Sequence, residues 1–162
     1  MEQMKDFLKI NFLPIWHHFL FFEMSRSRQA IKMIGSANGY LVFQVICWHY
    51  ILVIMNSSEI SYKGSYRDEV VDLWKKFGKE GFDTNTVLTY TLVAELTGLS
   101  IETVRRQVKK LTNDNWVSYS KKSGIKLEPS EENNNFLADT FNKKEVENFA
   151  VLLNIIEKKK LI

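Results

Sequence analysis

The sequence predicts a mainly helical protein that carries one small β-hairpin and has further helices toward both ends. Three observations support this fold class. Two short amphipathic segments, residues 91–97 and 100–113, lie on either side of a glycine, which indicates two helices joined by a tight turn. Residues 116–129 have the pattern of two strands around a Lys/Gly turn. Apolar stretches outside this region have helical spacing.

The first short helix is expected to begin at Thr91, whose hydroxyl can accept a hydrogen bond from an early backbone N–H. It should run through Leu96 and end at Gly98, because a helix exit favours a residue that tolerates positive φ. Leu99 is expected to fill the crevice before the next helix. Ser100 is then placed to cap that second helix.

The second helix, about Ser100–Asn113, is predicted to have one apolar face and one basic face. Val104, Val108 and Leu111 are spaced i, i+4, i+7 and share one side. At about 100° per residue, polar residues gather on the other side. They are Glu102, Arg106, Lys109 and Asn113, with Thr103, Arg105 and Lys110 flanking them.

The hairpin follows directly after this helix. Trp116–Tyr119 is predicted as its first strand and Ile125–Leu127 as the return strand, with Pro129 as the stop. The turn between the strands, Lys121–Gly124, places two lysines at the tip.

This order of elements resembles bacterial winged helix-turn-helix transcriptional regulators. The resemblance covers roughly a quarter of the chain, and its residues are Leu92–Ser100, Thr103–Arg106, Val108–Leu111 and Trp116–Val117 with the Lys/Gly hairpin. One departure is Asn113-Asp114-Asn115, where many relatives have a Gly-containing turn, although Asn tolerates the left-handed conformation. The resemblance implies a winged helix-turn-helix with flanking N- and C-terminal helices. It also implies sequence-specific DNA binding in transcription regulation, without catalysis.

In such a protein the second helix would lie in the major groove of double-stranded DNA, and the wing, about Trp116–Pro129, on the backbone or minor groove. Arg and Lys can donate hydrogen bonds to the O6/N7 edge of guanine and can neutralise phosphates. The residues expected to contact base edges are Glu102, Thr103, Arg105, Arg106 and Lys109. Those expected to contact phosphates are Ser100, Lys110, Lys121, Lys122 and Lys126.

The distribution of charge agrees with this placement better than the total does. The net charge is only +3. However, residues 105–126 hold seven Lys or Arg and a single acid, Asp114, whereas residues 131–162 hold six acids and five bases. The positive excess therefore lies on the proposed DNA-binding segment.

Residues 1–60 hold most of the aromatic side chains and are predicted to be a helical core or dimerisation region. A helix is expected over Met1–Asn11, and another beginning near Pro14. Ser27 is expected to cap a further short helix, and Gly35–Gly39 to break the chain. Because DNA readers commonly bind two half-sites, a homodimer is expected, with this region as its source.

The run Tyr40–Met55 is apolar except for Gln44 and His49. Its sixteen residues are fewer than the roughly 20 that cross a bilayer, and the two polar residues disfavour insertion. A helix buried in a core or dimer interface is therefore favoured, so no membrane association is expected. A membrane span, which would tether the regulator, and a buried β-strand remain the alternatives.

Residues 61–130 are predicted as the DNA-binding domain and residues 131–162 as a linker with a last helix. Asp68–Phe77 is the helix expected to pack beneath the second helix of the motif, and Gly78–Asn85 a loop. A short helix or turn with Val87, Leu88 and Tyr90, capped by Asp83 or Thr84, should lead into the motif. Ser130–Asn135 is expected to be a linker. Asn142 should cap an amphipathic helix with an apolar face made of Val146, Phe149, Leu152, Leu153 and Ile156.

The sequence contains no motif for catalysis, for a metal or for a cofactor. Its single cysteine, Cys47, fits a reducing cytoplasm, and no signal peptide is evident. Trp16, Phe19, Trp48 and Tyr50 suggest a core or interface, with an apolar effector pocket as the alternative, but no residue identifies a ligand. The alternative function is a non-catalytic protein-interaction module that uses the same fold and the aromatic N-terminal region.

Overall fold

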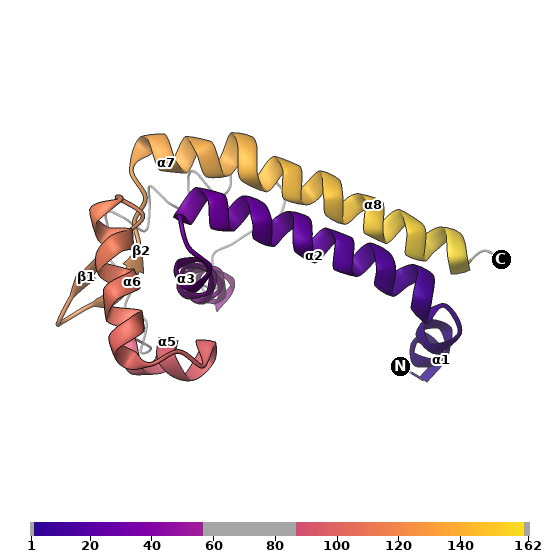
Figure 1. Cartoon of the computed structure of the whole chain (residues 1–162), viewed down its shortest axis with the longest axis horizontal. Helices are drawn as coiled ribbons and strands as arrows, with labels where there is room; N and C mark the ends of the chain where they lie inside the picture. The colour runs from indigo at the N-terminus through magenta and orange to yellow at the C-terminus, as the bar shows by residue number, and fades with distance from the viewer. Residues whose placement is uncertain (1, 57–86, 161–162) are drawn as a thin grey trace. The chain divides into compact units, whose positions relative to one another are not determined.

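A computed structural model describes residues 2–56 and 87–160 of the chain (Figure 1). These residues are mainly helical and include one two-stranded antiparallel sheet, so the predicted fold class is confirmed at this level. The chain forms two compact units. Unit 1 comprises residues 1–33 and 135–162, and unit 2 comprises residues 34–134. These boundaries differ from the predicted divisions after residues 60 and 130.

The described residues of unit 2 form three complete helices and a hairpin. In chain order they are α3 (Ala37–Asn56), α5 (Tyr90–Thr97), α6 (Ile101–Asn113), β1 (Val117–Ser120) and β2 (Gly124–Leu127). Its core is continuous across these elements, because α3 packs against α5, α6 and β2. The Phe43 ring of α3 meets the buried Trp116 ring edge to face, with the ring centres 5.3 Å apart.

The two short helices have the predicted order, with one correction at the start. Thr89 caps α5 by accepting a hydrogen bond from the Leu92 N–H, so the prediction of Thr91 as the cap was wrong. Thr89 has the extended backbone that a cap requires, and Thr91 already lies inside the helix. Gly98 ends α5 in the left-handed conformation, and Ser100 caps α6, both as predicted.

The hairpin pairs Val117 with Leu127 and Ser120 with Gly124. The segment before α5 lies beside it, since the Ile125 N–H donates to the Leu88 carbonyl oxygen at 2.9 Å. Leu88 is buried. The prediction of a helix or turn at Val87 and Leu88 was therefore wrong, because the exposed edge of β2 offers this segment a backbone partner.

Gly124 allows this close approach of the chain to β2. Its φ is 68°, and a Cβ at this position would lie 2.5 Å from the Leu88 carbonyl oxygen. We expect Gly124→Ala to destabilise unit 2 by about 2 kcal/mol or more, measured by denaturant unfolding, because strain and a backbone clash add. Gly98→Ala is the control, since Gly98 has a similar φ of 70° but nothing within 4 Å of its Cβ position. Equal losses in the two variants would contradict the clash.

The helix that packs against α5 and α6 among the described residues is α3. The sequence predicted Asp68–Phe77 in this place, and that segment, like Gly78–Asn85, lies outside the described residues. Tyr40, Val42, Phe43 and Ile46 of α3 are buried. The run beginning at Tyr40 is therefore a helix that contributes to a core, and the β-strand alternative was wrong. The break before α3 is confined to Gly35 and Ser36.

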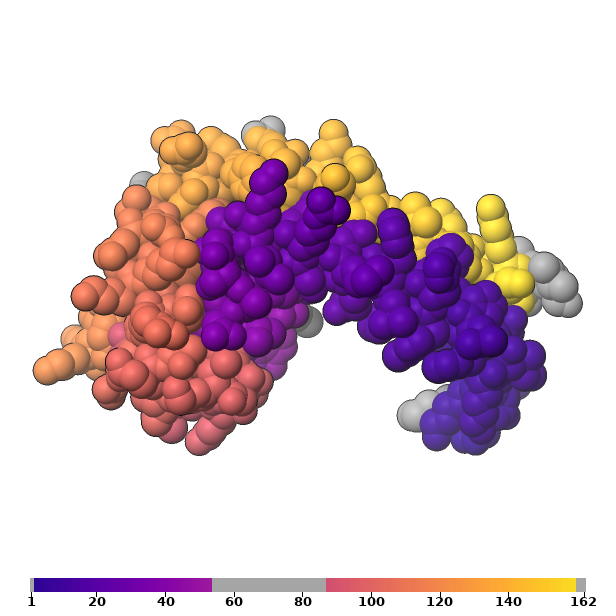
Figure 2. All heavy atoms as spheres, viewed as in Figure 1, coloured from indigo at the N-terminus to yellow at the C-terminus, as the bar shows by residue number. Residues whose placement is uncertain are grey.

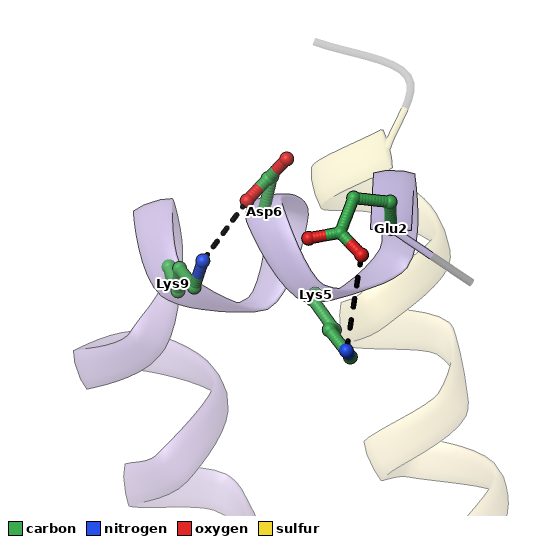
Figure 3. Close-up of polar contacts among 4 residues, drawn as sticks. All are labelled: Glu2, Lys5, Asp6 and Lys9. Carbon is green, nitrogen blue, oxygen red and sulfur yellow. Dashed lines mark hydrogen bonds and ion pairs between the residues drawn. The ribbon is translucent and has the colours of Figure 1, made fainter.

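Unit 1 begins with α1 (Glu2–Ile10) and α2 (Phe12–Ile34). The first helix and the position of Pro14 in the first turn of the second were predicted. The polar side of α1 carries two exposed ion pairs, Glu2–Lys5 and Asp6–Lys9, each between residues three apart (Figure 3). The expected helix start at Ser27 was wrong, because α2 continues through it without a break.

The C-terminal part of the chain is helical from Glu131 onward. It comprises α7 (Glu131–Phe136), a π-helical segment η1 (Leu137–Asn142) and α8 (Lys143–Lys160). The prediction of a linker at Ser130–Asn135 was wrong, since Ser130 accepts a hydrogen bond from the Asn133 N–H and starts α7. Asn142 does not start a helix, because the backbone is already helical there. Of the predicted apolar face of α8, only Leu152 is buried.

In unit 1, α2 and α8 run antiparallel and side by side (Figure 1). The rings of Phe22 and Phe149 are 5.5 Å apart, and Arg26 forms an ion pair with Glu145. Both charged side chains are about three-quarters buried. These contacts hold together segments from opposite ends of the chain.

No single helix in the described ranges is long and apolar enough to cross a bilayer. The consecutive helices α2 and α3, taken together as Phe12–Ile34 and Ala37–Val53, have the length and composition of a span but are bent by 100° at the break between them.

Candidate nucleic-acid interface

The exposed surface of α6 carries the basic face expected from its spacing. Val104, Val108 and Leu111 are almost completely buried. On the opposite side Glu102, Arg106 and Lys109 are all exposed. Among the described residues, none of these three forms an ion pair within unit 2. The face therefore presents two cations whose donors are available to an outside partner.

Ser100 and Thr103 are engaged with each other at the start of α6. The Ser100 hydroxyl accepts from the Thr103 N–H at 3.2 Å and donates to the Thr103 hydroxyl at 2.9 Å. Ser100 has a single hydroxyl proton, and this arrangement uses it. The predicted phosphate contact of Ser100 would require that proton to turn outward, so its structural role as a cap is the one observed.

One flank of α6 contacts the start of α3. The Ser36 hydroxyl donates to the side-chain oxygen of Gln107 at 3.2 Å, and Gln107 is buried. On the same flank, a Cβ at Gly35 would lie 2.8 Å from the Lys110 ammonium nitrogen. The Lys110 ammonium group is thus directed to the chain segment that precedes α3, whereas Arg106 and Lys109 lie on the outward face.

The turn between α6 and β1 is fixed by a residue that follows the hairpin. Asn115 has a φ of 57°, which fits the tolerance of Asn for the left-handed conformation. The Asn133 amide of α7 donates to the carbonyl oxygens of Asp114 and Asn115 at 2.9 and 3.0 Å. The position of β1 relative to the end of α6 is therefore held by hydrogen bonds from the Asn133 side chain to the backbone as well as by the core.

The other flank of α6 faces the hairpin through an aromatic pair. Tyr90, at the start of α5, and Tyr119, on β1, have ring centres 4.6 Å apart. The Arg105 guanidinium carbon lies 5.7 Å from the centre of the Tyr90 ring, a cation–π distance. Burial, the charge of Tyr119 and a hydrogen bond with Tyr119 raise the pKa of Tyr90, and Arg105 lowers it.

We expect Arg105→Ala to raise the pKa of Tyr90 further, because the cation that favours the phenolate is removed. Ultraviolet difference titration would measure this, with Tyr90→Phe identifying the Tyr90 signal and Lys109→Ala as the control. The stabilisation from neutral Tyr90 is complete below its unfolded pKa of about 10 and is lost as the pH rises through the higher folded value. A Tyr90 pKa that falls in Arg105→Ala would contradict the contact.

The hairpin places its lysines as the sequence suggested. Lys121 and Lys122 are exposed in the turn, and Lys126 is exposed on β2 opposite Ser118. The tip is braced by the Ser120 hydroxyl, which accepts from the Ser123 N–H at 3.0 Å. Figure 2 shows the hairpin protruding from the surface of unit 2.

The predicted site residues therefore divide into four groups, one of which is the pair Ser100 and Thr103 at the start of α6. Arg106, Lys109 and Glu102 share the outward face, Arg105 and Lys110 lie on opposite flanks, and the wing lysines lie beyond β1. Sequence reasoning missed Tyr90, Tyr119, Gln107 and Asn133. Only Gln107 had a local signal, because it is a polar residue on the apolar side of α6. Comparisons of the chain with protein-family models, curated proteins and solved structures gave no match.

Proposed function

We propose that this protein is a winged helix-turn-helix regulator that binds specific sequences in double-stranded DNA. In this proposal α6 enters the major groove and the hairpin lies along the backbone or minor groove as the wing. The observation that carries it is the outward face of α6, where Arg106 and Lys109 are exposed on a helix held at its other side by a core. Arginine on such a helix suits the guanine edge.

The arrangement around α6 supports this proposal over a helix that is simply solvated. A short helix, α5, precedes α6 and is joined to it by a tight turn at Gly98. A hairpin with lysines at its tip, held by the Ser120–Ser123 hydrogen bond, follows α6. An exposed basic helix alone needs none of these neighbours. DNA binding uses all of them, because phosphate contacts from the wing fix the register of the helix in the groove.

Selection from a randomised duplex pool, followed by sequencing and binding at two salt concentrations, tests the proposal. Enrichment of a defined site with affinity that falls steeply with salt is the expected result. Folded protein that binds no duplex at low salt would overturn it. That outcome would favour the protein-interaction module instead, whose apolar contacts depend little on salt.

We further propose that the regulator is a homodimer held by unit 1. Leu13, Leu20 and Met24 lie in one row along α2, and Leu13 is 78% exposed. Other large apolar side chains of unit 1 that are exposed are Met4, Leu8, Ile10, Phe12, Trp16, Phe21, Phe136, Val146, Phe149, Val151 and Leu153. At roughly 100 Å² for each half-exposed large side chain, they present on the order of 1,000 Å².

This summed exposed area supports a partner surface on unit 1. The largest apolar patch on a typical monomer is about 300–600 Å², and a stable interface needs about 800 Å² from each side. A second copy of the chain satisfies this requirement with the same surface on both sides. It would also supply the second reading helix that a two-half-site operator requires.

A further inference from the structure

Three side chains on the flank of α6 that faces the hairpin have no role in the proposed DNA contact by the outward face. Arg105, Tyr90 and Tyr119 come from three different elements and meet at the surface. Tyr119 is 43% exposed, and Arg105 is exposed as well. An apolar contact would be enough to pack the wing against α5. The cluster instead has two hydroxyl groups and a guanidinium group on the outside of unit 2.

The Arg105 guanidinium group is held but not neutralised. Its central carbon lies over the Tyr90 ring, 5.7 Å from the ring centre, and the ring accepts no conventional hydrogen bond from the guanidinium N–H groups. Within residues 2–56 and 87–160, no carboxylate lies at ion-pair distance from Arg105. A planar cation with its donors at the edge of a fixed ring matches an anion with several acceptor oxygens.

The position of Arg105 on α6 indicates which anion. It is one residue, and so about 100° around the helix, from Arg106 on the outward face. When the outward face meets base edges, the flank next to the wing faces a strand of the DNA backbone. A backbone phosphate oxygen can accept from arginine and from tyrosine hydroxyl groups.

We propose that Arg105 and Tyr119 form one binding site for a phosphate of the DNA backbone, in the angle between α6 and β1, and that the Tyr90 ring positions Arg105 in this site. This inference rests on the proposed DNA-binding function. It adds two tyrosines to the interface and assigns Arg105 to the backbone, where sequence reasoning had assigned it to a base edge.

A double-mutant cycle on the selected duplex tests the site, with affinity measured over a range of salt. We expect Arg105→Ala to weaken binding about 3–10-fold on all duplexes and to reduce the salt slope by about one. Tyr90→Leu should weaken binding for the same reason. The double variant should then be no weaker than Arg105→Ala alone, because the ring acts through the arginine. Tyr90→Phe, which keeps the ring, should bind nearly as well as the wild type.

Lys122→Ala serves as the matched control, because this lysine lies at the wing tip. The fold-loss of affinity in a variant with both Lys122→Ala and Tyr90→Leu should equal the product of the two single losses. Arg105→Lys keeps the charge without the planar group, so it should retain most of the salt slope but lose affinity. This variant tests the site independently if Tyr90→Leu folds poorly. Thermal unfolding of each variant reports on folding independently.

The outcomes separate the two proposals. Wild-type protein that binds no duplex overturns the DNA-binding function and this site with it. If the wild-type protein binds DNA but the losses of affinity in Arg105→Ala and Tyr90→Leu multiply in the double variant, Tyr90 does not act through Arg105. That outcome overturns the positioning role of Tyr90. A loss of preference at one base pair in Arg105→Ala would show that Arg105 contacts a base and would overturn the phosphate assignment.

Discussion

A variant that carries Leu13→Glu and Met24→Glu is expected to be monomeric and to bind a palindromic site about 100-fold or more weakly than the wild type. Both side chains are more than 60% exposed within a single chain, so glutamates there should leave the fold of unit 1 intact. In a dimer, they would bury unpaired charges in an apolar interface. Losing the second half-site removes the gain from simultaneous binding.

Sedimentation velocity would report the oligomeric state, and anisotropy would report binding to full sites and to half-sites. Lys32→Glu is the matched control, because it changes the net charge by the same amount on the same helix without altering an apolar side chain. It should remain dimeric. A double variant that remains a dimer would move the interface away from this row of α2, and a wild-type protein that sediments as a monomer would refute the dimer itself.

Arg106→Ala is expected to have the largest effect of any single substitution on α6. Its side chain lies near the centre of the outward face, opposite Val104 and Val108. Removing a bidentate contact to guanine costs about 1–3 kcal/mol on the preferred site and relaxes the preference at that base pair. Selection from the randomised pool, repeated with the variant, measures both effects.

Lys122→Ala separates base contact from backbone contact in the same assay. This lysine should contact phosphate, so its loss should weaken all duplexes to a similar extent and flatten the salt slope by about one. If Arg106→Ala also weakened every sequence equally, the outward face of α6 would not be reading base edges.

The parts of the fold that depend on neighbouring residues were predictable. The apolar spacing of Val104, Val108 and Leu111, the cap at Ser100 and the exit at Gly98 lie within a short segment, and each has a local physical cause. The hairpin follows from the same kind of evidence. Asn115 also adopted the left-handed conformation that its side chain permits.

The parts that depend on distant residues were not predictable. The polar residues around Arg26 suggested a break, but Arg26 pairs with Glu145, 119 residues away, and α2 continues. Leu88 lies outside any helix or turn and is held by a hydrogen bond from Ile125 of β2, 37 residues away. Tyr90 and Tyr119 meet only after α5 and β1 are both in place, so neither showed a signal of its own. Ser130 did have a visible signal, since a serine followed by two glutamates is typical of a helix start.

The contact between α3 and α6 has a consequence for the order of folding. Ser36 and Gln107 are 71 residues apart in sequence, whereas Asn133 and Asp114, which join α7 to the end of α6, are only 19 apart. Contacts between distant residues form later, because closing a longer loop costs more entropy. The segment from α6 to α7 should therefore form the folding nucleus of unit 2, and α3 should dock onto it afterwards. Substitutions in the α3 contact should then accelerate unfolding and leave the folding rate nearly unchanged.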